Sequence, residues 1–260
     1  MISDARVRTL ARQDSVTAGL AEKNYVNSWI LYAIYQSSLS EELVFKGGTA
    51  LSKLYFPEVW RFSEDLDFTA TQPVSSVKPT LREALDKAES ESGIEFEITN
   101  FYTAGDPPEY IQVDIQYEAV LGHKNTTQLD LTLDESMFFT STTHTHDFED
   151  VPEFKLQAYS VEEILVEKLR SLYQRARARD YYDIYRLLNQ REFAEEEIAA
   201  ALKTKAEQQN VQLDLGNGVP PEDIEDVRQY WNKALDRLVT DKPDFDTVIN
   251  QITDYLQKLR

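Results

Sequence analysis

Three stretches of alternating apolar and polar residues constrain the fold of this chain more than any other feature. They cover residues 94–103, 110–120 and 127–135. A period of two places successive side chains on opposite faces, which is typical of half-buried β-strands. The intervening segments AGDPPE and LGHKN carry turn-forming residues. The sequence therefore predicts a sheet in the first half of the chain.

From Ser160 onward the pattern changes to helix throughout. Ser160 and Glu163 have the spacing of a capping box at a helix start, and further amphipathic stretches follow. Residues 141–154 are polar and contain a proline, so we expect a connection between domains there. This predicts an α+β chain: a domain with a mixed sheet over residues 1–150, then an α-helical domain over residues 151–260.

The first half also carries helical patterns and short apolar runs. The helical patterns cover residues 4–40, 49–56 and 76–93, and strands are expected near residues 43–45 and at residues 65–69. Pro57 stops the second helix. The sheet of the first domain is therefore expected to be flanked by helices.

Composition limits the classes of protein to consider. The 260 residues include no cysteine, which excludes disulfides and Cys-ligated metal sites. The N-terminus has no apolar signal-peptide core, and the run WILYAIY is far shorter than the roughly 20 residues of a membrane span. We expect a soluble, cytoplasmic protein with no membrane partner.

The net charge of −19 repels nucleic acid and anionic lipid at long range. Adaptation to high salt explains such a surface, and so does an ordinary acidic cytosolic protein. In either case, a polyanionic substrate must bind at a local positive patch.

The segment KGGT, residues 46–49, combines features that suit phosphate. Two glycines allow a ligand to approach the backbone, the following helix start offers free amides, and Thr49 adds a hydroxyl. The alternative is a structural turn, which is the commoner reason for a Gly-Gly pair before a helix.

Asp65 and Asp67 are two residues apart on an expected strand, so their carboxylates lie on one face. Two like charges this close favour a cation between them, and oxygen ligands suit Mg²⁺. The alternative is a solvent-facing strand with acidic residues. Asp130, on another expected strand, would complete a site for two-metal phosphoryl transfer, and Asp114 competes for that place because the sequence does not give strand order.

Together these residues resemble a known family. FKGGTALSKLY, RFSEDLDF, QLDLTLDE, EEILVEKLRSL and RARDYYDIYRLL resemble the abortive-infection E type II (AbiEii) toxins, which belong to the polymerase β-like nucleotidyltransferases. The resemblance spans residues 22–188. The chain departs from much of the superfamily in a longer segment before Asp65, which contains FPEVW.

The resemblance implies a role for each matching residue. Nucleotide binding is implied for Lys46, Gly47, Gly48, Thr49, Arg61, Ser63, Lys168, Arg179, Asp180 and Asp183. Metal binding, with Mg²⁺ or Mn²⁺, is implied for Asp65, Asp67 and Asp130. A catalytic role is implied for these three carboxylates and for Lys168, with Asp130 as base toward the acceptor hydroxyl.

A basic segment supports the second part of this site. Lys168, Arg170, Arg175, Arg177 and Arg179 lie within twelve residues that contain no acid. If one helix continues through them, the first, third and fifth share a narrow arc and form the expected positive patch. The alternatives are that these cations pair with surface acids and that Asp180 caps a helix.

The function that the resemblance implies is transfer of a nucleoside monophosphate from an NTP to an acceptor hydroxyl on RNA, such as a tRNA 3′ end. The protein would be the toxin of a type IV toxin–antitoxin system in phage defence, with a cognate antitoxin encoded nearby. Two other functions stay open. One is nucleotidyl transfer to a small cationic molecule such as an aminoglycoside. The other is an inactive nucleotide-binding module that acts through protein contacts.

Overall fold

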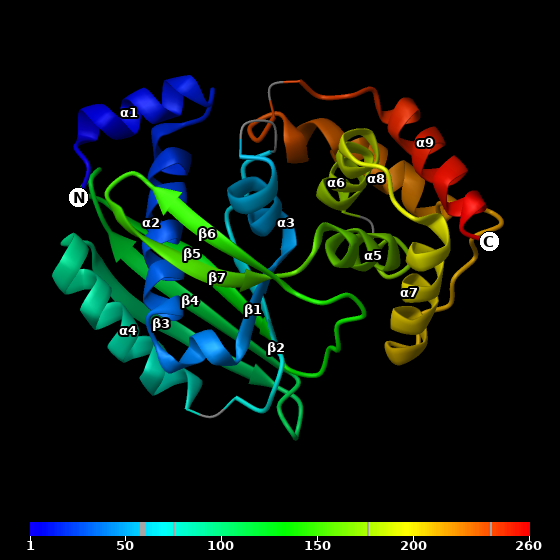
Figure 1. Ribbon diagram of the computed structural model, residues 1–260. Helices are drawn as coiled ribbons and strands as arrows, with labels where there is room; N and C mark the ends of the chain where they lie inside the picture. The colour runs from blue at the N-terminus through cyan, green and yellow to red at the C-terminus, as the bar shows by residue number, and fades with distance from the viewer. Residues whose placement is uncertain (58–60, 75, 176, 240) are drawn as a thin grey trace. The chain divides into compact units, whose positions relative to one another are not determined.

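The computed structural model describes residues 1–57, 61–74, 76–175, 177–239 and 241–260. Its contacts divide the chain into two compact units (Figure 1). The first contains residues 1–136 and 141–159, and the second contains residues 137–140 and 160–260. The division into functional domains at residue 150 stays a prediction.

A mixed sheet forms the centre of the first unit. Within the described residues it has seven strands: β1 (Leu43–Lys46), β2 (Leu66–Ala70), β3 (Glu95–Ala104), β4 (Tyr110–Glu118), β5 (Lys124–Thr132), β6 (Thr142–Phe148) and β7 (Val151–Ala158). Their order is β3-β4-β5-β2-β1-β7-β6. The pairs β2–β5 and β1–β7 are parallel, and the other pairs are antiparallel. The predicted mixed sheet is confirmed.

The helices of the first unit follow the predicted helical patterns. They are α1 (Asp4–Gln13), α2 (Ala18–Tyr35), the 3₁₀ helix η1 (Ser38–Glu41), α3 (Gly47–Ala50), the π-helical turn η2 (Leu51–Tyr55) and α4 (Val77–Ser92). The long pattern expected from residue 4 to residue 40 is therefore three pieces. Thr17 starts the second piece, because its side chain accepts a hydrogen bond from the amide of Leu20.

The interpretation of residues 141–154 as a polar connection is wrong, because β6 and β7 pair there as an antiparallel hairpin. The misleading feature is the polar stretch Thr-Thr-His-Thr-His, in which exposed Thr143 and Thr145 alternate with the less exposed Thr142, His144 and His146. Threonine is β-branched and suits a strand. His146 is buried, with Nε2 3.1 Å from the hydroxyl oxygen of Ser28. A polar composition does not exclude a strand where buried side chains have hydrogen-bond partners.

The two faces of the sheet differ in chemistry. Figure 1 shows α2 running across one face with α4 beside it. Tyr35 of α2 packs against Phe68 of β2, with ring centroids 6.5 Å apart. Because side chains alternate along a strand, Asp67 points to the opposite face.

The second unit is helical, as predicted. It contains α5 (Val161–Ser171), α6 (Ala178–Gln190), α7 (Glu195–Gln208), α8 (Pro221–Leu235) and α9 (Phe245–Lys258). The hydroxyl of Ser160 caps α5 by accepting from the amide of Glu163 at 3.2 Å. In the part of the chain that the structure describes, no helix has the length and apolar character of a membrane span.

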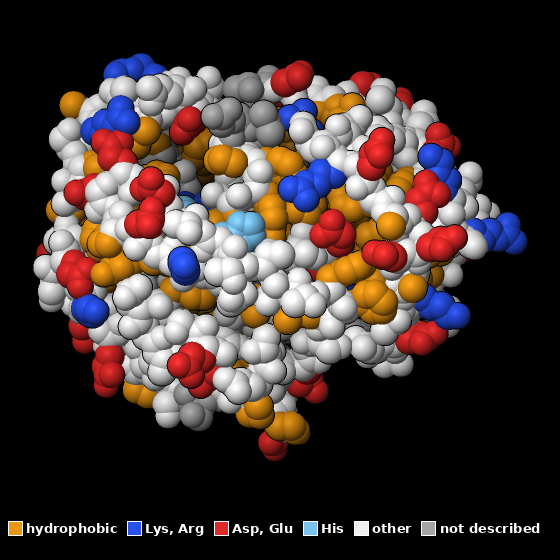
Figure 2. All heavy atoms as spheres, viewed as in Figure 1, with side chains coloured by type: hydrophobic (Ala, Val, Ile, Leu, Met, Phe, Trp, Pro, Cys, Tyr) orange, Lys and Arg blue, Asp and Glu red, His pale blue; other side chains and the backbone are white. Residues whose placement is uncertain are grey.

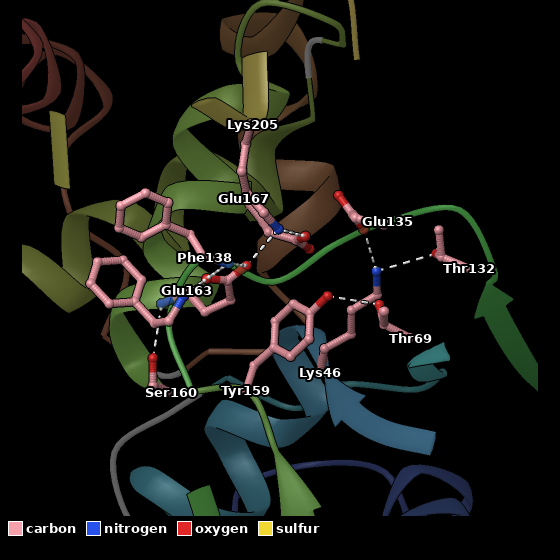
Figure 3. A network of polar contacts seen from close by, with 11 residues as sticks. Lys46, Thr69, Thr132, Glu135, Phe138, Tyr159, Ser160, Glu163, Glu167 and Lys205 are labelled. Carbon is pink, nitrogen blue, oxygen red and sulfur yellow. Dashed lines mark hydrogen bonds and ion pairs between the residues drawn. The ribbon is translucent and has the colours of Figure 1, made fainter. Parts of the chain in front are cut away.

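A buried ion cluster fixes the segment 137–140 within the second unit. Lys205 Nζ lies 2.6 Å from the carboxylates of both Glu163 and Glu167. The Glu163 carboxylate also accepts hydrogen bonds from the backbone amides of Phe138 and Phe139 (Figure 3). Glu163 is 0% exposed and Lys205 1% exposed, so their charges balance each other away from water.

Candidate active site

Asp67 and Asp130 lie directly opposite each other on the neighbouring parallel strands β2 and β5. In the register of the sheet, Asp67 also lies opposite Lys46 of β1, and Asp130 also lies opposite Gln112 of β4. Asp114 lies one strand further away, opposite Gln128, and its carboxylate accepts from the amide of Asn100 at 3.1 Å. The strand order therefore places Asp130, rather than Asp114, beside Asp67.

The two glycines of the KGGT segment bring the turn against these residues. Gly47 has a φ of +78°, and a Cβ built on it would collide with the Asp67 carboxylate. A Cβ on Gly48 would lie 2.5 Å from a guanidinium nitrogen of Arg61 and 3.3 Å from the hydroxyl oxygen of Ser63. The structure thus brings the glycines together with three of the predicted site residues.

A Gly47→Ala substitution should therefore reduce both stability and nucleotidyl transfer. The backbone conformation alone costs about 1–2 kcal/mol for a residue with a Cβ, and the collision with Asp67 adds to this. Gly122→Ala is the matched control, because Gly122 also has a positive φ of +66° but has nothing within 4 Å of the added Cβ. Equal unfolding free energies for the two variants in urea would contradict the role of the contact.

The side chain of Thr49 contacts the backbone of Asp65. The hydroxyl of Thr49 donates to the carbonyl oxygen of Asp65, just before β2, and Thr49 is buried. In this structure the hydroxyl therefore holds the loop that leads to the carboxylates. Phosphate binding by Thr49 and metal binding by Asp65 stay predictions.

Lys46 is part of a buried ion pair that the sequence analysis missed. Its Nζ lies 2.7 Å from the Glu135 carboxylate and 3.2 Å from the hydroxyl oxygen of Thr132, and it lies over the ring of Tyr159 (Figure 3). Glu135 stands at the end of an expected strand, and nothing in the sequence shows that this residue turns back toward β1. The ammonium group predicted to meet the nucleotide therefore has an anionic partner already.

Arg61 and Ser63 lie in the loop before β2. Arg61 is buried, and its Nη1 donates to the carbonyl oxygen of Phe62 at 3.1 Å. This agrees with support of the loop, while nucleotide binding by either residue stays a prediction. Within the longer FPEVW segment, residues 58–60 lie outside the described residues.

Lys53 connects the π-helical turn η2 to helix α2. Its Nζ donates to the carbonyl and side-chain oxygens of Asn24 at 2.9 and 2.6 Å, and to the hydroxyl of Ser28 at 2.8 Å. Burial lowers the pKa of Lys53 to about 7. The π-helical turn that carries Lys53 is therefore fixed on α2, just after the two glycines.

Two further residues that the sequence analysis missed hold Asp130. Tyr110 donates its hydroxyl to Oδ1, and the Gln128 amide donates to Oδ1 at 2.8 Å and to Oδ2 at 2.9 Å. Burial and the neighbouring Asp130 raise the pKa of Tyr110, so its hydroxyl stays protonated as a donor. The sequence could have indicated Gln128, because it precedes Asp130 by two residues on one strand and therefore lies on the same face.

Lys168 lies in the second unit within another buried cluster. Its Nζ is 3.1 Å from Asp180 and 2.7 Å from Asp183, and Arg175 lies 3.2 Å from Asp180. Asp180 is inside α6, where Arg177 takes the N-cap position, so it is not a helix cap. The nucleotide-binding roles of Lys168, Arg179, Asp180 and Asp183 stay predictions.

The expectation of a positive patch along one continuous helix is wrong. Helix α5 ends at Ser171 and α6 begins at Ala178, so the arc drawn through the basic residues does not exist. Figure 2 shows acidic side chains spread over one face of the molecule, with Lys and Arg among them. Because the net charge of −19 makes the electrostatic field around the protein negative, phosphate is best held by short-range ligands such as backbone amides or a metal ion.

The residues present fit a divalent metal ion that also binds substrate phosphate. Asp67 and Asp130 supply carboxylate oxygens from neighbouring strands, which are the donors that Mg²⁺ and Mn²⁺ prefer. Among the residues described, no group of three or more His, Asp or Glu is placed to hold a metal by itself. Mg²⁺ sites commonly use one or two carboxylates and complete the coordination with water and phosphate.

Comparisons with known proteins find one matching family model and several similar solved structures. The family model described as the nucleotidyl transferase AbiEii toxin of a type IV toxin–antitoxin system matches residues 29–251. Among solved structures, the nucleotidyltransferase toxin MenT4 from Mycobacterium tuberculosis H37Rv is similar, with a TM-score of 0.71 and 18% identity over 99% of this chain and 90% of that one. JHP933 from Helicobacter pylori has a TM-score of 0.59 and 18% identity over 94% and 93% of the two chains. No curated protein sequence matches.

Proposed function

This chain belongs to the family of AbiEii nucleotidyltransferase toxins of type IV toxin–antitoxin systems, and from that premise we propose that it transfers a nucleoside monophosphate from an NTP to a hydroxyl of an RNA acceptor. The observation that carries the proposal is the facing pair Asp67 and Asp130, set beside the turn at Gly47. A carboxylate pair next to a close-approach glycine suits a triphosphate with its metal ion.

In this proposal each residue has one task. Asp67 and Asp130 hold Mg²⁺ or Mn²⁺, which when bound neutralises charge on the transferring phosphoryl group. Gly47 and Gly48 let the backbone approach the phosphates. The oxygen of the acceptor hydroxyl bonds to the α-phosphorus of the NTP as its proton is released, and pyrophosphate leaves.

For the acceptor we propose RNA, and specifically a tRNA 3′ end, with a cognate antitoxin as the protein partner. The description of the family as toxins of type IV toxin–antitoxin systems supports the antitoxin as a partner. The RNA acceptor is what the family resemblance implies. A small cationic acceptor is the competing outcome, because the net charge of −19 suits a cationic molecule better than RNA.

The test is incubation with each α-labelled NTP, Mg²⁺ and total RNA, with an aminoglycoside supplied in parallel. We expect label on RNA in the size range of tRNA, and no label when EDTA replaces Mg²⁺. Label on the aminoglycoside alone would replace RNA as the acceptor. NTP binding that is indifferent to Mg²⁺ in calorimetry, together with no transfer, would indicate an inactive binding module.

A further inference from the structure

We propose that Tyr110 and Gln128 are positioning residues that fix the carboxylate of Asp130 and leave its Oδ2 atom as the oxygen directed to the metal ion. The inference rests on the proposed function and names two residues that the family resemblance does not assign. It concerns three side chains on adjacent strands of one sheet.

The contacts come from two directions. Tyr110 is the first residue of β4 and lies opposite Thr132, two residues beyond Asp130 on β5. Its hydroxyl reaches diagonally to Oδ1 of Asp130. Gln128 lies on the same face of β5, two residues before Asp130, and donates to Oδ1 at 2.8 Å and Oδ2 at 2.9 Å.

The two oxygens of Asp130 are therefore not equivalent. Among the residues that the structure describes, Oδ1 accepts from both Tyr110 and Gln128, whereas Oδ2 accepts only from Gln128. A carboxylate oxygen offers about two acceptor positions, so Oδ1 is filled and Oδ2 keeps one. The terminal torsion of an Asp side chain is soft, and the two donors together determine which oxygen is presented.

Both donors are uncharged, and this distinguishes Asp130 from Glu135 and Glu163, whose carboxylates pair with lysines. Glu135 pairs with Lys46, and Glu163 pairs with Lys205. A cationic partner would compete with a metal ion for the carboxylate, whereas hydroxyl and amide donors orient it and leave its charge in place. This is the arrangement expected for an anion that has to bind a cation.

The test compares Tyr110→Phe and Gln128→Met with the wild-type chain. Binding of Mn²⁺ alone, followed by the free-ion EPR signal, should weaken about tenfold in each variant, because a hydrogen bond to a charged group is lost. In transfer assays kcat should fall by about tenfold or more, while KM for the NTP stays near the wild-type value. Tyr102→Phe is the matched control: Tyr102 is 54% exposed on β3, and the loss of its hydroxyl should change neither readout.

The outcomes separate this inference from the proposed function. Unchanged Mn²⁺ affinity and unchanged kcat in both folded variants would overturn the inference, even if the wild-type protein transfers nucleotide. Weakened Mn²⁺ binding in both variants would support it, even if the wild-type protein shows no transfer to RNA. Should one variant not fold, the other variant decides alone.

Discussion

Replacing Asp67 or Asp130 by Asn is expected to reduce nucleotidyl transfer by at least about 10²–10³-fold, because a divalent metal contributes several kcal/mol to stabilising transition-state charge. Asn keeps the size and shape of the side chain beside Gly47 and Tyr110, removes the negative charge and replaces one acceptor oxygen by an amide donor. The measurement is the initial rate with α-labelled NTP at saturating Mg²⁺. The loss should appear mainly in kcat.

Folding should survive both substitutions. The two carboxylates face each other across β2 and β5, and removing one of them relieves repulsion. This relief offsets the hydrogen bonds that the substituted side chain loses, so the thermal unfolding midpoint is expected to change little. Asp114→Asn on the same sheet is the matched control and should keep nearly full activity. If Asp114→Asn abolished nucleotidyl transfer while Asp130→Asn kept it, the metal-binding role would belong to Asp114 and not to Asp130.

Lys205→Met is expected to destabilise the protein by about 3–5 kcal/mol, because it leaves the carboxylate of Glu163 buried without a cation. Glu163 is 0% exposed, so water cannot replace the lost partner. Equilibrium unfolding in urea, followed by circular dichroism, measures the effect as a lower midpoint of the transition.

Two controls test the cause of this loss. Lys203→Met changes an exposed lysine on the same helix and should change the free energy of unfolding by less than about 0.5 kcal/mol. The double substitution Glu163→Gln with Lys205→Met should recover part of the loss, since the buried charge is then removed. A Lys205→Met variant as stable as the wild type would refute the importance of the pair.

Local patterns in the sequence predicted most elements of this fold. The period of two marked β3, β4 and β5, and helical spacing marked α4 and the helices after Ser160, because burial of one face imposes these periods directly. The hairpin β6–β7 was missed because β6 carries threonine and histidine where apolar residues are expected, and because β7 contains Pro152. The break between α5 and α6 was left open, because the basic residues at that point suit a continuous helix while Asp180 suits a helix cap.

The candidate site was predictable as a set of residues but not as an arrangement. The order β5-β2-β1 depends on contacts between distant parts of the chain, and these leave no local pattern that could distinguish Asp130 from Asp114. The same holds for Glu135, which pairs with Lys46 across 89 positions of sequence. Tyr110 also contacts Asp130 from another strand, so its role follows only from the register of the sheet.

The membership of residues 137–140 in the second unit has a consequence for folding during synthesis. The amides of Phe138 and Phe139 leave the ribosome before Glu163, their acceptor, and before Lys205, its counter-ion. The helical unit therefore cannot complete its charged core until most of the chain has been made. A fragment that begins at Ser160 would lack the two backbone hydrogen bonds that Phe138 and Phe139 give to the buried carboxylate of Glu163.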